Sequence, residues 1–236
     1  MRPSLSPHGM EPVFVSWSVS HWAALALILS ATAALLIGGR RLDTTGRRRL
    51  CNALAALMVA ELPAEYTCRF LSPEYGPWRD NLPLHFCTFM QLMSAVALRY
   101  RRHYACAGVF FCVLTASIQA LITPALKADW PSIVYVFFFL SHGLLLAAAL
   151  AIPLLADWRA RRWDPLFCVL LGDVYILFIH PINLLLDTNY GFTRMSPAGS
   201  MLDYLGPAPW YFLLLQLPAL ALFSLLYLTV REKPRP

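Results

Sequence analysis

Thiol, imidazole and amide side chains recur at helical spacing inside long apolar runs of this 236-residue chain. Cys87, Gln91 and Ser94 follow one another at four and three positions, so they share one face of a helix. His142 stands in a separate apolar run, where a polar group usually faces the interior of a helix bundle. An imidazole can take the proton of a neighbouring thiol and so activate the sulfur for attack on a carbonyl carbon. Cys87 and His142 are therefore our candidate nucleophile and general base.

Each of these two residues also has a plainer interpretation. A cysteine in an apolar helix usually behaves as an inert small hydrophobe. A buried histidine is often only a hydrogen-bonded core residue. The spacing by itself leaves both interpretations open.

Further polar residues in the apolar runs could support such a pair. Asp173 and His180 are seven positions apart, and Asn183 stands beside them. We assign Asp173 to orienting the imidazole and keep His180 as a rival base. Gln91, Gln119 and Asn183 are candidate donors to the oxyanion of an acyl-transfer intermediate. Hydrogen bonding between helices is the alternative role for these amides.

The depth of these groups along their helices predicts a shared cavity. With a rise of about 1.5 Å per residue, Cys87 lies about 8 Å and His142 about 16 Å below one membrane face. Asp173 is the deepest of them, at about 20 Å. Nearly all the polar groups fall in one half of the bilayer, so we expect a single cavity that opens toward the extracytoplasmic side.

Apolar segments of membrane-spanning length must position these residues. The chain is 58% hydrophobic and only 14% charged, with a mean hydropathy of +0.57. Seven stretches approach the roughly 20 apolar residues that a spanning helix needs, at 17–38, 50–66, 82–98, 103–123, 131–155, 165–186 and 208–230. We therefore predict an all-α, polytopic membrane protein: one seven-helix transmembrane domain over residues 1–236.

The basic residues predict the orientation of that bundle. Most of the 19 lysines and arginines fall in alternate loops and the C-terminal tail, namely Arg40, Arg41, Arg47, Arg48, Arg49, Arg99, Arg101, Arg102, Arg159, Arg161, Arg162, Arg231, Lys233 and Arg235. Such segments stay in the cytoplasm. The N-terminus is then outside and the C-terminus cytoplasmic, in a multi-pass protein of the inner or plasma membrane if the cell is bacterial.

Composition and motifs also exclude some classes of function. The net charge of +6 is explained by the cytoplasmic loops, so we expect no nucleic-acid partner. The six cysteines form neither CxxC nor a zinc-like Cys/His spacing, and no cofactor motif is present. We expect neither a metal nor a cofactor.

Short motifs in a fixed order resemble a known family. They are Leu-Pro-Leu-His-Phe-Cys at 82–87, Gln-Ala-Leu-Ile-Thr-Pro at 119–124, Phe-Phe-Leu-Ser-His-Gly at 138–143, Asn-Leu-Leu-Leu-Asp-Thr-Asn-Tyr at 183–190 and Leu-Gly-Pro-Ala-Pro-Trp-Tyr at 205–211. From about residue 50 onward the chain resembles the YwaF-like integral membrane proteins. The animal branch of that family comprises transmembrane acyltransferases that remodel ether phospholipids. The cysteine and histidine that form their catalytic pair correspond by motif to Cys87 and His142.

The resemblance implies a cysteine-dependent acyltransferase acting on membrane phospholipid and lysophospholipid. A fatty acyl chain would pass between the two lipids through a thioester on Cys87, with His142 as general base. An intramembrane lipid hydrolase with the same pair is the first alternative, since water could replace the lysophospholipid. A proton-coupled small-molecule transporter is the second, with Asp173, His142 and His180 as a relay.

Overall fold

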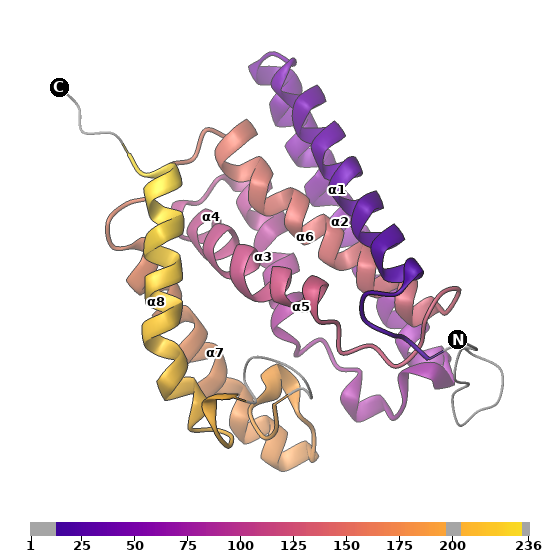
Figure 1. The fold of residues 1–236 in the computed structure, drawn as a ribbon. Coiled ribbons are helices and arrows are strands. Elements are labelled where there is room, and N and C mark those ends of the chain that lie inside the picture. The colour runs from indigo at the N-terminus through magenta and orange to yellow at the C-terminus, as the bar shows by residue number, and fades with distance from the viewer. Residues whose placement is uncertain (1–12, 197–203, 233–236) are drawn as a thin grey trace.

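The computed structural model describes residues 13–196 and 204–232. Arg2, Lys233, Arg235 and part of the connection at 187–207 lie outside the described residues. Apart from two isolated bridges, the regular structure of the described residues is helical (Figure 1). The helices are α1 (Val19–Arg40), α2 (Thr44–Leu71), α3 (Phe86–Tyr100), α4 (His103–Gly108), η3 (Val109–Ser117), α5 (Ile118–Ile122), α6 (Ile133–Leu155), α7 (Asp164–Leu186) and α8 (Tyr211–Val230), with short turns η1 (Pro73–Tyr75), η2 (Trp78–Asp80) and η4 (Tyr190–Phe192).

Five helical segments are long and apolar enough to cross a membrane. They are α1, α6, α7, α8 and the continuous segment His103–Ile122, which joins α4, η3 and α5. The chain is therefore all-α and a multi-pass integral membrane protein. The segment η3 is a π-helix, a wider turn than the α-helix and one that is frequent at functional sites.

The predicted spans 50–66 and 82–98 are not among these five. The helix α2 has 28 residues, but it contains arginines in its first turns and Glu61, Glu65 and Arg69 further on. The helix α3 has only 15 residues, about 22 Å of helix. A helix overlaps each predicted range, but α2 extends beyond 50–66 at both ends and α3 begins four residues after position 82. By length or composition, both fall short of a typical span.

Local signals explain where several helices begin. The Ser18 side chain accepts from the His21 N–H at the start of α1, and Asp43 accepts from the Gly46 N–H at 2.7 Å. Ser132 caps α6 by accepting from the Val134 N–H at 3.1 Å. The N-cap of α3 is His85, whose side chain makes no capping bond. The first turn of α3, which contains Cys87, is therefore held by tertiary contacts rather than by a local cap.

The segments rich in arginine come together at one end of the bundle, here called the basic end. Gly39, at the end of α1, packs against Leu155 at the end of α6. The loops after α3 and α6 meet through His103 and Asp164, whose side chains are 3.0 Å apart. A backbone bridge joins Ala160 to Arg231, just after α8. Connections that are far apart in the sequence thus share one end.

A second set of contacts defines the opposite end. The Ser20 hydroxyl donates to Asp129 at 2.8 Å, joining the start of α1 to the loop before α6. The Tyr75 hydroxyl reaches the Ile133 carbonyl at 3.4 Å, and the Tyr190 hydroxyl donates to the Arg79 carbonyl at 2.6 Å. The start of α1 therefore lies at the end opposite to the end of α8, as the ribbon also shows (Figure 1).

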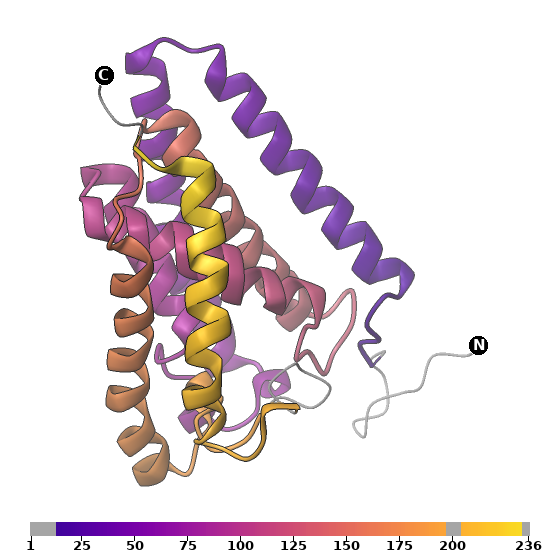
Figure 2. The same cartoon turned by 60° about the vertical axis from the view of Figure 1, so that its left-hand side comes forward.

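The helix α6 lies at the centre of the bundle. More than half of its residues are buried, including a run of small side chains from Ala147 to Ala149. By contrast, α7 and α8 pack together on one flank and α1 lies on the other (Figure 2). Their outward faces are almost entirely apolar and exposed, as expected for helices that face lipid.

Candidate active site

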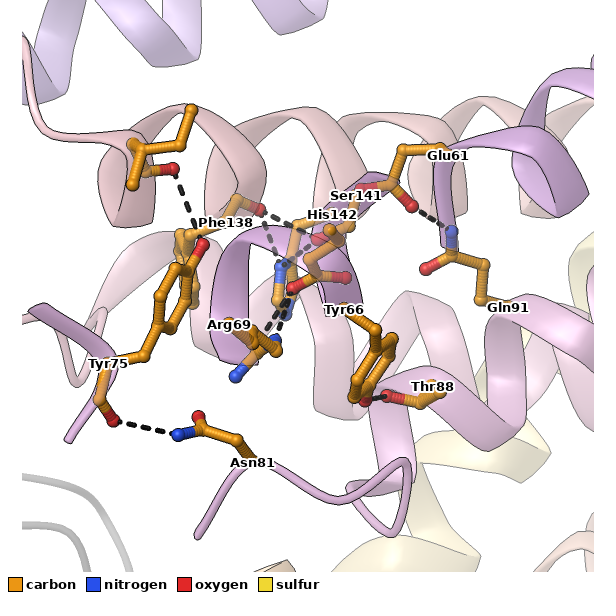
Figure 3. Close-up of polar contacts among 12 residues, drawn as sticks. Glu61, Tyr66, Arg69, Tyr75, Asn81, Thr88, Gln91, Phe138, Ser141 and His142 are labelled. Carbon is orange, nitrogen blue, oxygen red and sulfur yellow. Dashed lines mark hydrogen bonds and ion pairs between the residues drawn. The ribbon is translucent and has the colours of Figure 1, made fainter. Parts of the chain in front are cut away.

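A buried ion pair lies on the face of α2 that looks into the bundle. The guanidinium of Arg69 donates to Oε1 of Glu65 from Nε at 3.0 Å and from Nη2 at 2.6 Å. The Glu65 side chain is only 5% exposed, and that of Arg69 is 21% exposed. Arg69 also lies over the rings of Tyr66 and Tyr75, 5.4 and 4.9 Å from their centroids. A fixed positive charge thus sits inside the protein (Figure 3).

The first two turns of α3 are held against α2 by side-chain hydrogen bonds. The Tyr66 hydroxyl and Thr88 Oγ1 are 2.9 Å apart. One turn further, the Gln91 amide donates to the Met58 carbonyl at 3.1 Å and to the carboxylate of Glu61. These bonds flank the half-buried Cys87 and fix its position relative to α2.

The imidazole of His142 is held in one orientation by its own helix. Its Nδ1 lies 2.8 Å from the Phe138 carbonyl, and the ring stacks on that of Phe138 at 4.2 Å. A carbonyl only accepts, so Nδ1 carries the hydrogen. The other nitrogen, Nε2, is buried and has no partner among the described residues. A proton on Nε2 would create a buried imidazolium without a partner, close to the positive charge of Arg69. The Nε2 atom is therefore unprotonated and carries a free lone pair.

Arg69 is a charged neighbour that Cys87 and His142 share. The Glu65 carboxylate also acts electrostatically on Cys87, with the opposite sign to Arg69 and more strongly. Ser117, the last residue of the π-helix, lies next to the Cys87 thiol, and its buried hydroxyl completes no hydrogen bond within the described part of the chain. Helices α2, α3 and α6 and the π-helix thus each contribute a side chain. We call Glu65, Arg69, Cys87, Ser117 and His142 the polar cluster.

Tyr75 and Asn81 cover the cluster from the end opposite to the basic end. The Asn81 amide donates to the carbonyls of Tyr75 and Pro77 at 3.2 and 3.0 Å, which shapes the turn before α3. Burial raises the pKa of Tyr75, and the nearby Arg69 offsets only part of that rise. The phenol therefore stays neutral and acts as a hydrogen-bond donor.

A comparison with family models identifies the family of this chain. The TMEM164 family model matches residues 16–227, which is nearly the whole chain. The chain belongs to the TMEM164 family. This is the animal transmembrane acyltransferase family, which is linked to lipid acyltransferase activity, so the family predicted from the motifs is confirmed. Comparisons with curated proteins and with solved structures give no match.

In this TMEM164-family protein, the predicted orienting and rival groups have hydrogen-bond partners outside the polar cluster. Asp173 accepts from the Gln216 amide of α8 at 2.7 Å. It does not hold the imidazole of His142, because the Phe138 carbonyl occupies Nδ1. His180 pairs instead with the Thr193 hydroxyl at 3.1 Å, in the connection after α7.

Two of the three predicted oxyanion donors are likewise engaged elsewhere. The Gln119 amide donates to Thr123 within its own segment at 2.9 Å. Asn183 organises the connection after α7 by donating to Thr193 Oγ1 and to the Tyr190 carbonyl, each at 2.7 Å. Gln91 is the one that borders Cys87, on the same face of α3, and its amide is already bonded to Glu61 and Met58.

The ion pair and Ser117 are not predicted by the sequence patterns. The predicted span 50–66 ends before Arg69, whereas α2 continues to Leu71 and so places Arg69 on the helix. The spacing of Glu65 and Arg69, four positions apart, was the available signal for a shared helix face. No such signal marks Ser117. Among the described residues, no group of three or more His, Cys, Asp or Glu side chains is placed to hold a metal ion.

Proposed function

We propose that this protein transfers a fatty acyl chain from a phospholipid to a lysophospholipid through a thioester on Cys87, with His142 as general base. The observation that carries the proposal is the imidazole of His142. Its Nδ1 hydrogen is held by a backbone carbonyl, and its Nε2 lone pair is buried and, among the described residues, unpaired. Arg69 acts electrostatically on both this imidazole and the Cys87 thiol, which supports placing the two near each other. A base needs a free lone pair of this kind.

In the first half-reaction, Nε2 of His142 takes the thiol proton and the Cys87 sulfur attacks the ester carbonyl carbon of the donor. The tetrahedral intermediate then expels the glycerol oxygen, which receives the proton back from His142. The products are a lysophospholipid and the acyl thioester. In the second half-reaction, His142 takes the proton of an acceptor hydroxyl, whose oxygen attacks the thioester and restores the thiol.

Arg69 and Ser117 supply stabilisation that the predicted amides do not. Arg69 places a positive charge near Cys87, but the Glu65 carboxylate acts there more strongly and disfavours the thiolate. The role that we assign to Arg69 is therefore at the negative oxyanion. The Ser117 hydroxyl lies next to the Cys87 thiol and has no oxygen or nitrogen partner among the described residues, so it can turn to donate to the developing oxyanion. Preorganised charges and hydrogen-bond donors stabilise a developing negative charge more strongly in a low-dielectric site than in bulk water, because solvent screens them less.

We propose that the basic end is cytoplasmic and that the chain crosses the membrane seven times, with α2 and α3 as the second and third crossings. The arginine-rich connections share that end. The start of α1 and the end of α8 lie at opposite ends, which requires an odd number of crossings. The polar cluster then lies in the extracytoplasmic half, with its charged groups enclosed by α2, α3 and α6 rather than facing lipid.

The test uses purified protein in lipid nanodiscs with a phospholipid donor that carries an isotope-labelled acyl chain. Intact-mass and peptide analysis measure the acyl group on Cys87, and product analysis after adding lysophospholipid separates transfer from hydrolysis. We expect labelled phospholipid as the main product, no thioester in Cys87→Ala, and unchanged transfer in Cys51→Ala, whose thiol is buried in the core.

Two outcomes would overturn the proposal. If free fatty acid is the main product despite saturating lysophospholipid, the protein is a hydrolase. If Cys87→Ala transfers acyl chains at the wild-type rate, the thiol is not the nucleophile.

A further inference from the structure

An apolar groove runs along the outside of the bundle between the start of α3 and α7. It has a volume of about 230 Å³ and is lined by Leu84, Phe89, Leu171, Val174, Tyr175 and Phe178, among others. The lining contains no charged side chain. Its one polar side chain, Tyr175, already donates its hydroxyl to the Leu84 carbonyl at 2.8 Å. An occupant of this groove therefore needs no hydrogen-bonding groups of its own.

The groove opens on a face that looks toward lipid. Val174 and Phe178 on its rim are 63% and 66% exposed, on a helix whose outward face is apolar along its length. Leu171 lies deeper and is half-buried. In a membrane, the molecules next to such a face are hydrocarbon chains.

Tyr175 connects the groove to the polar cluster. Its ring packs edge-on against Phe86, the residue before Cys87, with centroids 4.9 Å apart. It is close enough to Cys87 for the two groups to interact electrostatically. The ring is held from the other side by Gly191, where a Cβ would lie 2.7 Å from the tyrosine ring. Tyr175 is therefore a fixed wall that the groove shares with the surroundings of the thiol.

We infer that this groove holds the acyl chain of the donor phospholipid, with the ester carbonyl directed past Tyr175 to the Cys87 sulfur. The inference rests on the proposed function and adds the place and chemical class of the bound chain. A headgroup or a peptide would leave its polar groups without partners among these side chains, at a cost that a hydrocarbon chain avoids.

Photo-crosslinking tests occupancy without turnover. The protein with Cys87→Ala is placed in nanodiscs that contain a trace of phospholipid with a diazirine in the middle of its acyl chain, and labelled residues are mapped by peptide sequencing. Bulk lipid would label Leu177, which is 73% exposed and outside the groove, more than the half-buried Leu171. We expect the reverse, with Leu171 labelled more strongly than Leu177.

Two tryptophan variants make the comparison sharper. Val174→Trp fills the mouth of the groove, and Leu177→Trp places the same ring on the same helix outside it. With native Cys87, we expect Val174→Trp to slow formation of the oleoyl thioester about tenfold. This is the effect expected when about two methylene groups of the acyl chain are no longer buried in the groove. The hexanoyl thioester should form at the wild-type rate in Val174→Trp, and Leu177→Trp should behave as wild type with both chains.

The outcomes separate this inference from the proposed function. Labelling that follows exposure, with Leu177 above Leu171, overturns the groove assignment even if Cys87 is acylated. Equal slowing of oleoyl and hexanoyl transfer by Val174→Trp also overturns it, since that result indicates general damage. Labelling of Leu171 without any thioester on native Cys87 supports a lipid-binding groove and overturns acyl transfer. The labelling pattern is measured in Cys87→Ala alone and needs no tryptophan variant, so a folding failure of a tryptophan variant leaves that test intact.

Discussion

Removing the positive charge of Arg69 should destabilise the protein and abolish thioester formation for two separable reasons. In Arg69→Met the stem of the side chain is kept, but Glu65, with only 5% of its side chain exposed, loses its ion-pair partner. Breaking one member of a buried pair costs about 3–5 kcal/mol, because the remaining charge is buried without compensation. We expect a loss of that order in the free energy of unfolding, measured by detergent titration of the purified protein.

The double variant Glu65→Met with Arg69→Met separates stability from chemistry. Replacing both members of a buried pair by apolar side chains is often neutral, so the double variant should recover most of the lost free energy. It should not recover thioester formation, which we expect to stay about 10²–10³-fold below wild type, the cost of losing one oxyanion-stabilising group. Arg79→Met, at an exposed arginine of the same end, should change neither quantity.

Two results would refute this reasoning. A double variant as unstable as Arg69→Met would mean that the buried carboxylate is not the source of the instability. A double variant with wild-type thioester formation would mean that Arg69 has a structural role only.

Three further predictions follow from the same contacts. Ser117→Ala should lower the rate of thioester formation by about 10²-fold while the unfolding midpoint stays unchanged, because its buried hydroxyl completes no hydrogen bond within the described residues. A wild-type rate would exclude it as an oxyanion donor. Gln91→Leu leaves the carboxylate of Glu61 and the Met58 carbonyl without their donor and should cost about 1–3 kcal/mol in unfolding free energy, and an unchanged detergent midpoint would contradict this. Arg194 lowers the pKa of Asp187. Their ion pair therefore stabilises the connection after α7 at pH values above the ordinary aspartate pKa, and this stabilisation is lost as the pH falls through the lowered pKa of Asp187. Hydrogen exchange at 187–195 should show this acid dependence in wild type and not in Arg194→Ala.

The helices and the family could be predicted from the sequence because both depend on local features, namely apolar runs and short motifs. The predicted spans 103–123, 131–155 and 165–186 coincide within two residues at each end with the helical segments His103–Ile122, Ile133–Leu155 and Asp164–Leu186. A long apolar run must satisfy its backbone within itself in lipid, so it forms a helix whatever surrounds it. The order of the short motifs likewise identified the family without any coordinates.

The partners of the polar side chains were decided only by the tertiary structure. Asp173 bonds to Gln216 and not to His142, because the rotation of α7 turns that carboxyl toward α8. Spacing along one helix shows which residues share a face, but not which neighbouring helix that face meets.

The polar cluster and the groove depend on the same long-range geometry. Arg69 joins the cluster because α2 extends past its apolar run to Leu71, and Ser117 joins it where the π-helix ends beside α3. Tyr175 borders the groove because α7 packs against the start of α3. Hydropathy and motif order determined that this chain is a membrane-embedded helix bundle of the TMEM164 family. Helix rotation, tilt and packing, which depend on contacts between residues distant in the sequence, decided which of its polar groups meet.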